Sequence, residues 1–147
     1  MLKGIPACIP PELLKVLHEM GHGDTLVIGD ANFPAASMAA EKNHINIRCD
    51  GHRATQMLDA ILQLVPLDEF VEKPVTIMDK MEMHRDLECP VWDEFKGIVA
   101  KYDSRGGDAV DFTDRFSFYE KAKDAYGIVS TSETALYACI IIQKGCL

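Results

Sequence analysis

The chain has 147 residues, 48% of them apolar and 26% charged, and its formal net charge is −8. This length and composition predict a globular protein with one hydrophobic core, which we assign as a single domain over residues 1–147. The acidic balance and the lack of any Lys/Arg cluster argue against nucleic acid or an anionic membrane as a partner, because both require a basic surface.

The sequence contains no sign of export or membrane insertion. No apolar run approaches the ~20 residues that span a bilayer, and the N-terminal stretch is interrupted by Pro6, Pro10 and Pro11. The five cysteines are scattered without a C-x-x-C pair, which favours reduced thiols over a disulfide or zinc framework. We therefore expect a cytoplasmic protein.

The first elements along the chain are a helix and a buried strand. Leucines at helical spacing predict a helix over 11–20, with Gly21 at its C-terminal cap. The apolar run at 25–29 predicts a central strand that places Asp30 at its carboxyl end. Residues 31–43 lack periodicity and contain a proline, so we predict a loop that forms a functional rim.

Helices and strands continue to alternate in the middle of the chain. Strands are predicted at 44–48 and 74–80, and one-sided apolar spacing predicts helices within 52–65 and 90–102. A turn follows at 104–108. Such alternation is typical of an α/β fold.

The C-terminal third contains one more helix and two strands. Asp114 is predicted to cap a helix over 115–126, and apolar runs predict strands at 127–131 and 136–145. Only a few residues join these strands, too few for a crossover helix, so we predict an antiparallel pair and a mixed sheet. The complete pattern predicts a three-layer α/β/α sandwich with helices on both faces.

Two polar residues flank the first strand. His22 follows a predicted helix end, where the macrodipole favours an imidazolium that could act as a general acid, although it could also serve only as a cap. Asp30 lies at a carboxyl strand end, where ligands collect in α/β folds, although it could also simply begin a turn. A five-residue strand spans roughly 17 Å. If both residues serve one site, either the turn bends back or two chains meet.

Other histidines and a cysteine give weaker evidence for a functional site. His18 and His22 are four residues apart, as metal ligands on a helix can be, but the predicted helix ends before His22. We therefore predict no metal site. His84 is expected to be solvated or locally bonded. Cys139 could be a nucleophile, but the sequence identifies no base to activate it.

Three motifs together resemble a known family. They are the helix–GHGD–strand–D-x-x-F/Y-P pattern of residues 11–34, RFSFYE at 115–120, and T-x-E-x-x-x-Y at 131–137. The chain is similar in these motifs to the sugar mutarotase family that includes L-fucose mutarotase and D-ribose pyranase. Arg115 resembles the fucose branch, since the ribose branch carries a histidine there. The resemblance implies a cofactor-free isomerase that interconverts the α and β anomers of a free monosaccharide, L-fucose or a related sugar.

The resemblance also implies roles for individual residues. His22 corresponds to the proton donor, and Asp30 and Arg115 to sugar-binding residues. Tyr119 and Glu120 are secondary candidates, which could also be packing and surface charge. The family assembles into decamer-type rings with sites between subunits, which implies a homo-oligomer.

The sequence departs from the family at its C-terminal binding triplet. Tyr137, Ala138 and Cys139 stand where the family typically has Tyr-Gly-Asn, and a thiol cannot replace the donor and acceptor of an amide. This change alters contacts to a sugar hydroxyl and leaves the substrate open. It also leaves a second function open, a non-catalytic sugar-binding or sensing protein that retains the pocket.

Overall fold

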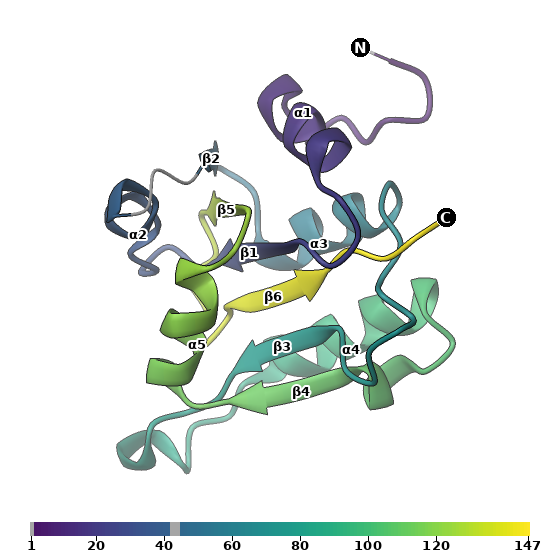
Figure 1. Cartoon of the computed structure of the whole chain (residues 1–147). Helices are drawn as coiled ribbons and strands as arrows, with labels where there is room; N and C mark the ends of the chain where they lie inside the picture. Colours follow the sequence, from purple (N-terminus) through teal and green to yellow (C-terminus); the bar gives the residue numbers. More distant parts are fainter. Residues whose placement is uncertain (1, 42–44) are drawn as a thin grey trace.

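The computed structural model describes residues 2–41 and 45–147 (Figure 1). In this part of the chain the helices are α1 (Pro11–Glu19), α2 (Ala35–Glu41), α3 (Ala54–Leu62), α4 (Pro90–Tyr102) and α5 (Arg115–Lys123). The strands are β1 (Thr25–Gly29), β2 (Ile45–Cys49), β3 (Val75–Met78), β4 (Val110–Thr113), β5 (Gly127–Thr131) and β6 (Ile140–Gln143). Two short 3₁₀ segments, η1 (Glu82–His84) and η2 (Gly106–Ala109), complete the elements. None of these helices is long and apolar enough to cross a membrane.

The strands of the described residues form one mixed sheet in the order β2-β5-β1-β6-β3-β4. β6 is antiparallel to its neighbours β1 and β3, and the other pairs are parallel. The mixed sheet is therefore confirmed. The predicted pairing of the last two strands is wrong, because β1 lies between them. Residues 132–139 carry the chain past the carboxyl end of β1 instead of closing a hairpin.

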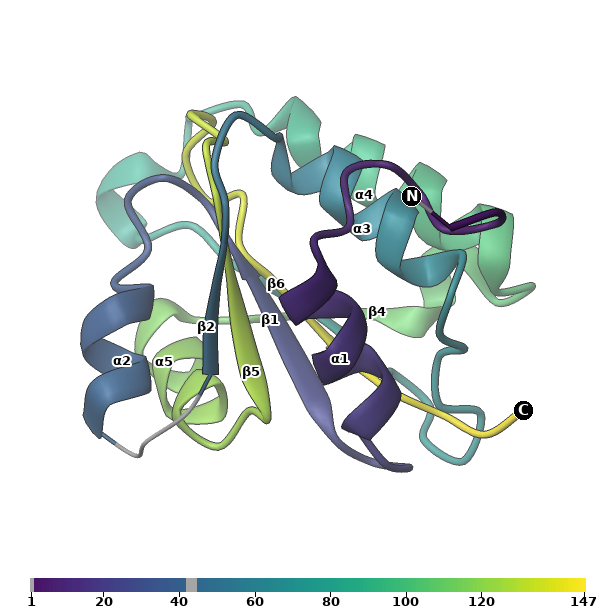
Figure 2. The same cartoon turned by 90° about the horizontal axis from the view of Figure 1, so that it is seen from above.

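Helices cover both faces of the sheet, which confirms the three-layer α/β/α sandwich (Figure 2). α1, α3 and α4 bury apolar residues against one face, and α2 and α5 bury theirs against the other. Successive side chains of a strand point to opposite faces. Leu26 and Ile28 of β1 accordingly join the first core, and Val27 joins the second.

Two segments differ from their predictions. The loop predicted over 31–43 is correct for residues 31–34, where Asn32 and Phe33 line the cleft described below, and wrong for Ala35–Glu41, which forms α2. Residues 42 and 43 lie outside the described residues. The buried residues of α2, which are Ala35, Met38 and Ala39, have helical spacing, but the surrounding alanines hide that pattern. β4 was not predicted, because a four-residue strand at the sheet edge buries only Val110 fully and leaves no clear alternation.

The predicted ends of several elements also shift. The helix expected over 115–126 ends at Lys123, and the strand expected over 136–145 narrows to Ile140–Gln143. Residue 44, at the start of the strand predicted over 44–48, lies outside the described residues. Asp114 caps α5 as predicted, accepting hydrogen bonds from the backbone N–H groups of Phe116 and Ser117.

Gly29 at the end of β1 is packed too closely to carry a side chain. An added Cβ would lie 2.7 Å from Cβ of Phe33, which folds back over the strand end. We expect Gly29→Ala to lower the free energy of unfolding by about 1–3 kcal/mol through overpacking. Gly97→Ala in α4 is the matched control: it meets no atom within 4 Å and should raise that free energy by up to ~1 kcal/mol. Urea unfolding measures the free energy of unfolding of both variants. Equal changes in the two would contradict close packing at Gly29.

Candidate functional site

A cleft of about 520 Å³ opens where β1, β3 and β4 end. Asp30, Arg115, Tyr119, Tyr137 and Cys139 line it. This is the carboxyl edge of the parallel strands, where ligands of α/β proteins bind. The fold therefore brings five of the eight predicted site residues to one cavity.

Asp30 is the buried acid of the cleft, with 7% of its surface exposed. Its carboxyl Oδ1 accepts the backbone N–H of Asn32 at 2.9 Å, and the backbone N–H of Ala138 also donates to it. Burial raises the pKa of Asp30 above its ordinary value, although these hydrogen bonds act in the opposite direction. Ala138 itself is fully buried and so contributes through its backbone.

Cys139 lies beneath Asp30 and is nearly inaccessible. Its Sγ accepts the backbone N–H of Asp30 at 3.5 Å. Burial, together with the neighbouring Asp30 carboxylate, raises the pKa of the Cys139 thiol well above its usual value. Because the thiolate is the reactive form of cysteine, these surroundings do not favour Cys139 as a nucleophile.

Tyr137 is held in an unusual conformation at the cleft wall. Its φ is +58°, which lies in the left-handed region. This conformation costs a non-glycine residue about 1–3 kcal/mol, and residues that adopt it cluster at functional sites. Trp92 Nε1 donates to its carbonyl at 3.0 Å. The Tyr137 hydroxyl accepts the backbone N–H of Met81 at 3.3 Å and lies 2.6 Å from Nδ1 of His84. The sequence pattern did not single out His84 as a cleft residue, because only the fold brings it to Tyr137.

Arg115 and Tyr119 form the mouth of the cleft from the first two turns of α5. They are four residues apart and therefore share one helix face. Arg115 Nε donates to the Tyr119 hydroxyl at 2.9 Å, and its guanidinium carbon lies 5.1 Å from the ring centre. Among the described residues Arg115 forms no ion pair, so its charge is available to a ligand. Glu120 does not line the cleft; its carboxylate pairs with Lys123 at 3.1 Å.

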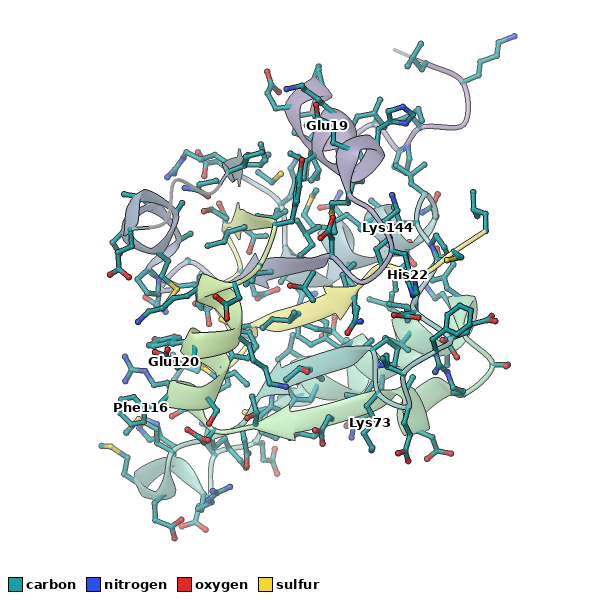
Figure 3. All side chains as sticks on the ribbon, viewed as in Figure 1. Glu19, His22, Lys73, Phe116, Glu120 and Lys144 are labelled. Atoms are coloured by element: carbon teal, nitrogen blue, oxygen red, sulfur yellow. The ribbon has the colours of Figure 1, made fainter. Side chains whose placement is uncertain are left out.

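His22 lies at the other end of the sheet. In Figure 3 it is beside Lys144, far from Phe116 and Glu120 of α5. Its Nε2 is 3.1 Å from both carboxylate oxygens of Asp68, and its ring centre is 5.2 Å from that of Phe70. Within one chain, His22 and Asp30 are thus separated by the length of β1, as the strand length predicts.

The predicted interaction of His22 with the C-terminal end of α1 is not formed, because Lys144 occupies that position. Lys144 Nζ donates to the carbonyls of Leu17 at 2.9 Å and Met20 at 2.5 Å. Its ammonium therefore occupies the negative end of the helix, and His22 turns to Asp68 instead. α1 ends at Glu19, so His18 and His22 do not share a helix face. No three His, Cys, Asp or Glu side chains within 2–41 and 45–147 gather as metal ligands.

Comparison with known proteins gives full-length matches. The model of the RbsD / FucU transport protein family matches residues 3–147. The fucose mutarotase of Homo sapiens is 45% identical, with 99% of this chain and 94% of that protein covered. FucU from Bifidobacterium longum superposes with a TM-score of 0.94 at 51% identity, covering 99% of both chains. The fucose mutarotase from Streptococcus pneumoniae, solved in complex with L-fucose, has a TM-score of 0.89 at 41% identity, again covering 99% of both.

Proposed function

Because the chain belongs to the RbsD / FucU family, we propose that it is a mutarotase that interconverts the α and β anomers of L-fucose or a closely related free sugar. The observation that carries this proposal is the full-length similarity to fucose mutarotases, one of them solved with L-fucose. The cleft at the carboxyl edge of the sheet supports it, since its size and the polar side chains of Asp30, Arg115 and Tyr137 suit a monosaccharide.

The reaction needs two proton transfers. Ring opening breaks the bond between the anomeric carbon and the ring oxygen, adds a proton to that oxygen, and removes one from the anomeric hydroxyl. Closure on the other face of the aldehyde reverses both transfers. In our proposal His22 donates the proton to the ring oxygen, and water accepts the proton that leaves the anomeric hydroxyl. Asp30, Arg115 and Tyr137 hold the sugar hydroxyls by hydrogen bonds, two of them charge-assisted.

The proposal requires that two chains share each site, because His22 and Asp30 lie at opposite ends of one sheet. We infer a homo-oligomer, of the decamer-type ring that the family resemblance implies, in which His22 of one chain faces the cleft of the next. A contact between two different surfaces generates rings when it closes. Exposed apolar residues at both ends support such a contact: Phe70 beside His22 is 78% exposed, and Met83 at the cleft is 77% exposed.

Saturation-transfer NMR on equilibrated sugars tests the function directly. With L-fucose we expect faster exchange of magnetisation between the anomers in the presence of the protein than in buffer, and weaker enhancement with D-ribose. The alternative function, a non-catalytic sugar-binding or sensing protein, predicts binding without enhanced exchange. That alternative has one specific observation in its favour, the replacement of the triplet amide by the buried Cys139.

The pH dependence of sugar affinity follows from the raised pKa of Asp30. A sugar hydroxyl donates best to the ionised carboxylate, so affinity for L-fucose should fall on acidification at a higher pH than for an exposed aspartate. Isothermal titration at several pH values measures this, and Asp30→Asn should give a flat profile over the same range.

Acid unfolding does not explain the predicted fall in affinity for L-fucose. Because the folded-state pKa of Asp30 is raised, the folded protein binds more protons at this residue than the unfolded chain, so the contribution of Asp30 to stability grows as the pH falls. As the pH falls, the affinity for L-fucose should therefore decrease while the contribution of Asp30 to folding stability increases. An affinity that stays constant down to the onset of acid unfolding would contradict the role of the carboxylate.

A cytoplasmic location is also part of the proposal. It is supported by the cysteines at positions 8, 49, 89, 139 and 146, which are all free thiols. Free thiols are typical of proteins in a reducing compartment.

A further inference from the structure

His84 is a histidine of the cleft that the proposed reaction does not use. It ends the short 3₁₀ segment η1 and lines the cleft together with Arg115 and Tyr137. Its Nδ1 lies 2.6 Å from the Tyr137 hydroxyl, and the two rings are in edge contact with their centres 5.8 Å apart. The imidazole is therefore bonded to the same hydroxyl that is proposed to hold the sugar.

Tyr137 is anchored, and what remains variable is the orientation of its hydroxyl proton. Trp92 Nε1 donates to its carbonyl at 3.0 Å, and the backbone N–H of Met81 donates to its hydroxyl oxygen at 3.3 Å. A hydroxyl group has one proton to donate and two lone pairs that accept. Because Met81 takes one lone pair, the direction of the bond between Tyr137 and His84 decides what the hydroxyl offers a ligand.

The distance indicates that the hydroxyl donates to His84. A hydroxyl donor usually approaches its acceptor to about 2.5–3.0 Å, whereas an N–H donor usually stays about 2.7–3.2 Å from an oxygen. The 2.6 Å between Tyr137 and His84 falls only in the first range. A neutral imidazole with its proton on Nε2 accepts such a bond at Nδ1.

This direction leaves the hydroxyl oxygen of Tyr137 with one free lone pair. Its proton points to His84 and Met81 holds its other lone pair, so toward a sugar the hydroxyl can only accept. With the opposite direction both lone pairs would be taken, and the hydroxyl could only donate. Every sugar hydroxyl carries a proton, so an acceptor at this place suits such a ligand.

We propose that His84 is a positioning residue for Tyr137: its Nδ1 accepts the phenol proton and thereby keeps the hydroxyl oxygen as an acceptor for one hydroxyl of the sugar. This inference rests on the proposed function, because it takes L-fucose or a related sugar to be the ligand. A hydroxyl that is oriented in advance loses little rotational freedom when the sugar binds, which lowers the cost of binding.

The tautomer of His84 tests the geometry in the wild-type protein. Long-range ¹H–¹⁵N NMR of ¹⁵N-histidine protein at about pH 8, where the imidazole of a model peptide is neutral, should show the proton of His84 on Nε2. The signals of His84 are those that the spectrum of His84→Phe lacks. A proton on Nδ1 would overturn the proposal, because the hydroxyl of Tyr137 could then not donate to this nitrogen.

A double-mutant cycle tests the consequence for sugar binding. His84→Phe keeps an aromatic ring beside Tyr137 but removes the acceptor, and Tyr137→Phe removes the hydroxyl itself. Each should raise the Kd for L-fucose about 3- to 10-fold in isothermal titration, the effect of one uncharged hydrogen bond. The double variant should match Tyr137→Phe within twofold, because no hydroxyl is left to orient. Single effects that multiply in the double variant would show that His84 only supports the cleft, and would overturn the proposal.

His52→Phe is the matched control. Nδ1 of His52 likewise lies close to a side-chain oxygen, 3.1 Å from that of Gln56, but His52 does not line this cleft. Its replacement should leave the Kd for L-fucose unchanged. Where a variant of the cycle does not fold, the tautomer of the wild-type protein still decides.

The failure of the proposed function gives a different result. A wild-type protein that neither binds L-fucose nor accelerates its anomer exchange would contradict the mutarotase proposal, whatever the tautomer of His84. A wild-type protein that does both, while His84→Phe leaves the Kd unchanged, would contradict only the positioning role of His84.

Discussion

Replacement of His22 by alanine is expected to lower the rate of L-fucose anomer exchange by about 10²–10⁴-fold, the usual contribution of a positioned general acid. The ring lies on the protein surface against Asp68 and Phe70, so its loss should leave the fold intact. Exchange NMR measures the rate, with circular dichroism to confirm folding. His18→Ala is the matched control, because His18 is an exposed histidine of α1. Exchange at the wild-type rate in His22→Ala would exclude this residue from the mechanism.

The same variant tests whether sites form between chains. A His22→Ala chain retains an intact cleft, and an Asp30→Ala chain retains an intact His22. When the two are co-expressed in equal amounts, about a quarter of the sites in a ring of head-to-tail contacts should combine both intact halves. The mixture should therefore recover activity that neither variant has alone. A mixed assembly that remains inactive would contradict a site shared between subunits.

Replacement of Arg115 by methionine should weaken L-fucose binding about 10- to 100-fold, because hydrogen bonds to a charged group each contribute about 1.5–3 kcal/mol. Methionine keeps part of the aliphatic stem but removes every donor. The guanidinium lies at the cleft mouth, and among the residues that the structure describes its hydrogen-bond partners are the uncharged Tyr119 and Met81. The substitution should therefore affect ligand binding more than folding. Isothermal titration gives the Kd.

Arg48→Met serves as the control for this change. Arg48 is an exposed arginine whose guanidinium already pairs with Asp50 at 2.8 Å, and it does not line the same cleft as Arg115. Its replacement should leave the Kd unchanged. An Arg115→Met protein that binds L-fucose within twofold of the wild type would remove Arg115 from the sugar site.

Much of the fold could be predicted from local patterns. The apolar run of β1 and the one-sided spacing of α4 each identify an element because burial imposes a period of two or 3.6 residues. Asp30 could be placed at the ligand-binding edge for the same reason, since it directly follows a buried strand. The errors fall where that signal is weak: α2 is alanine-rich, and β4 is a short edge strand.

The arrangement around His22 could not be predicted in this way. Its partner Asp68 is 46 positions away in the sequence, and the cation at the end of α1 is Lys144, more than 120 positions from Met20. The contact between His84 and Tyr137 likewise spans 53 positions. No local pattern marks such pairs, because they depend on which strands become neighbours.

The sequence alone thus determined the layered α/β architecture, the cap of α5 and the edge at which Asp30 lies, because each follows from periodicity or from a residue's place at the end of an element. Only the tertiary structure decided the strand order, the carboxylate that holds His22 and the wall that Tyr137 forms in the cleft. Those features arise from contacts between distant segments, and such contacts are set by how the completed sheet and its helices pack.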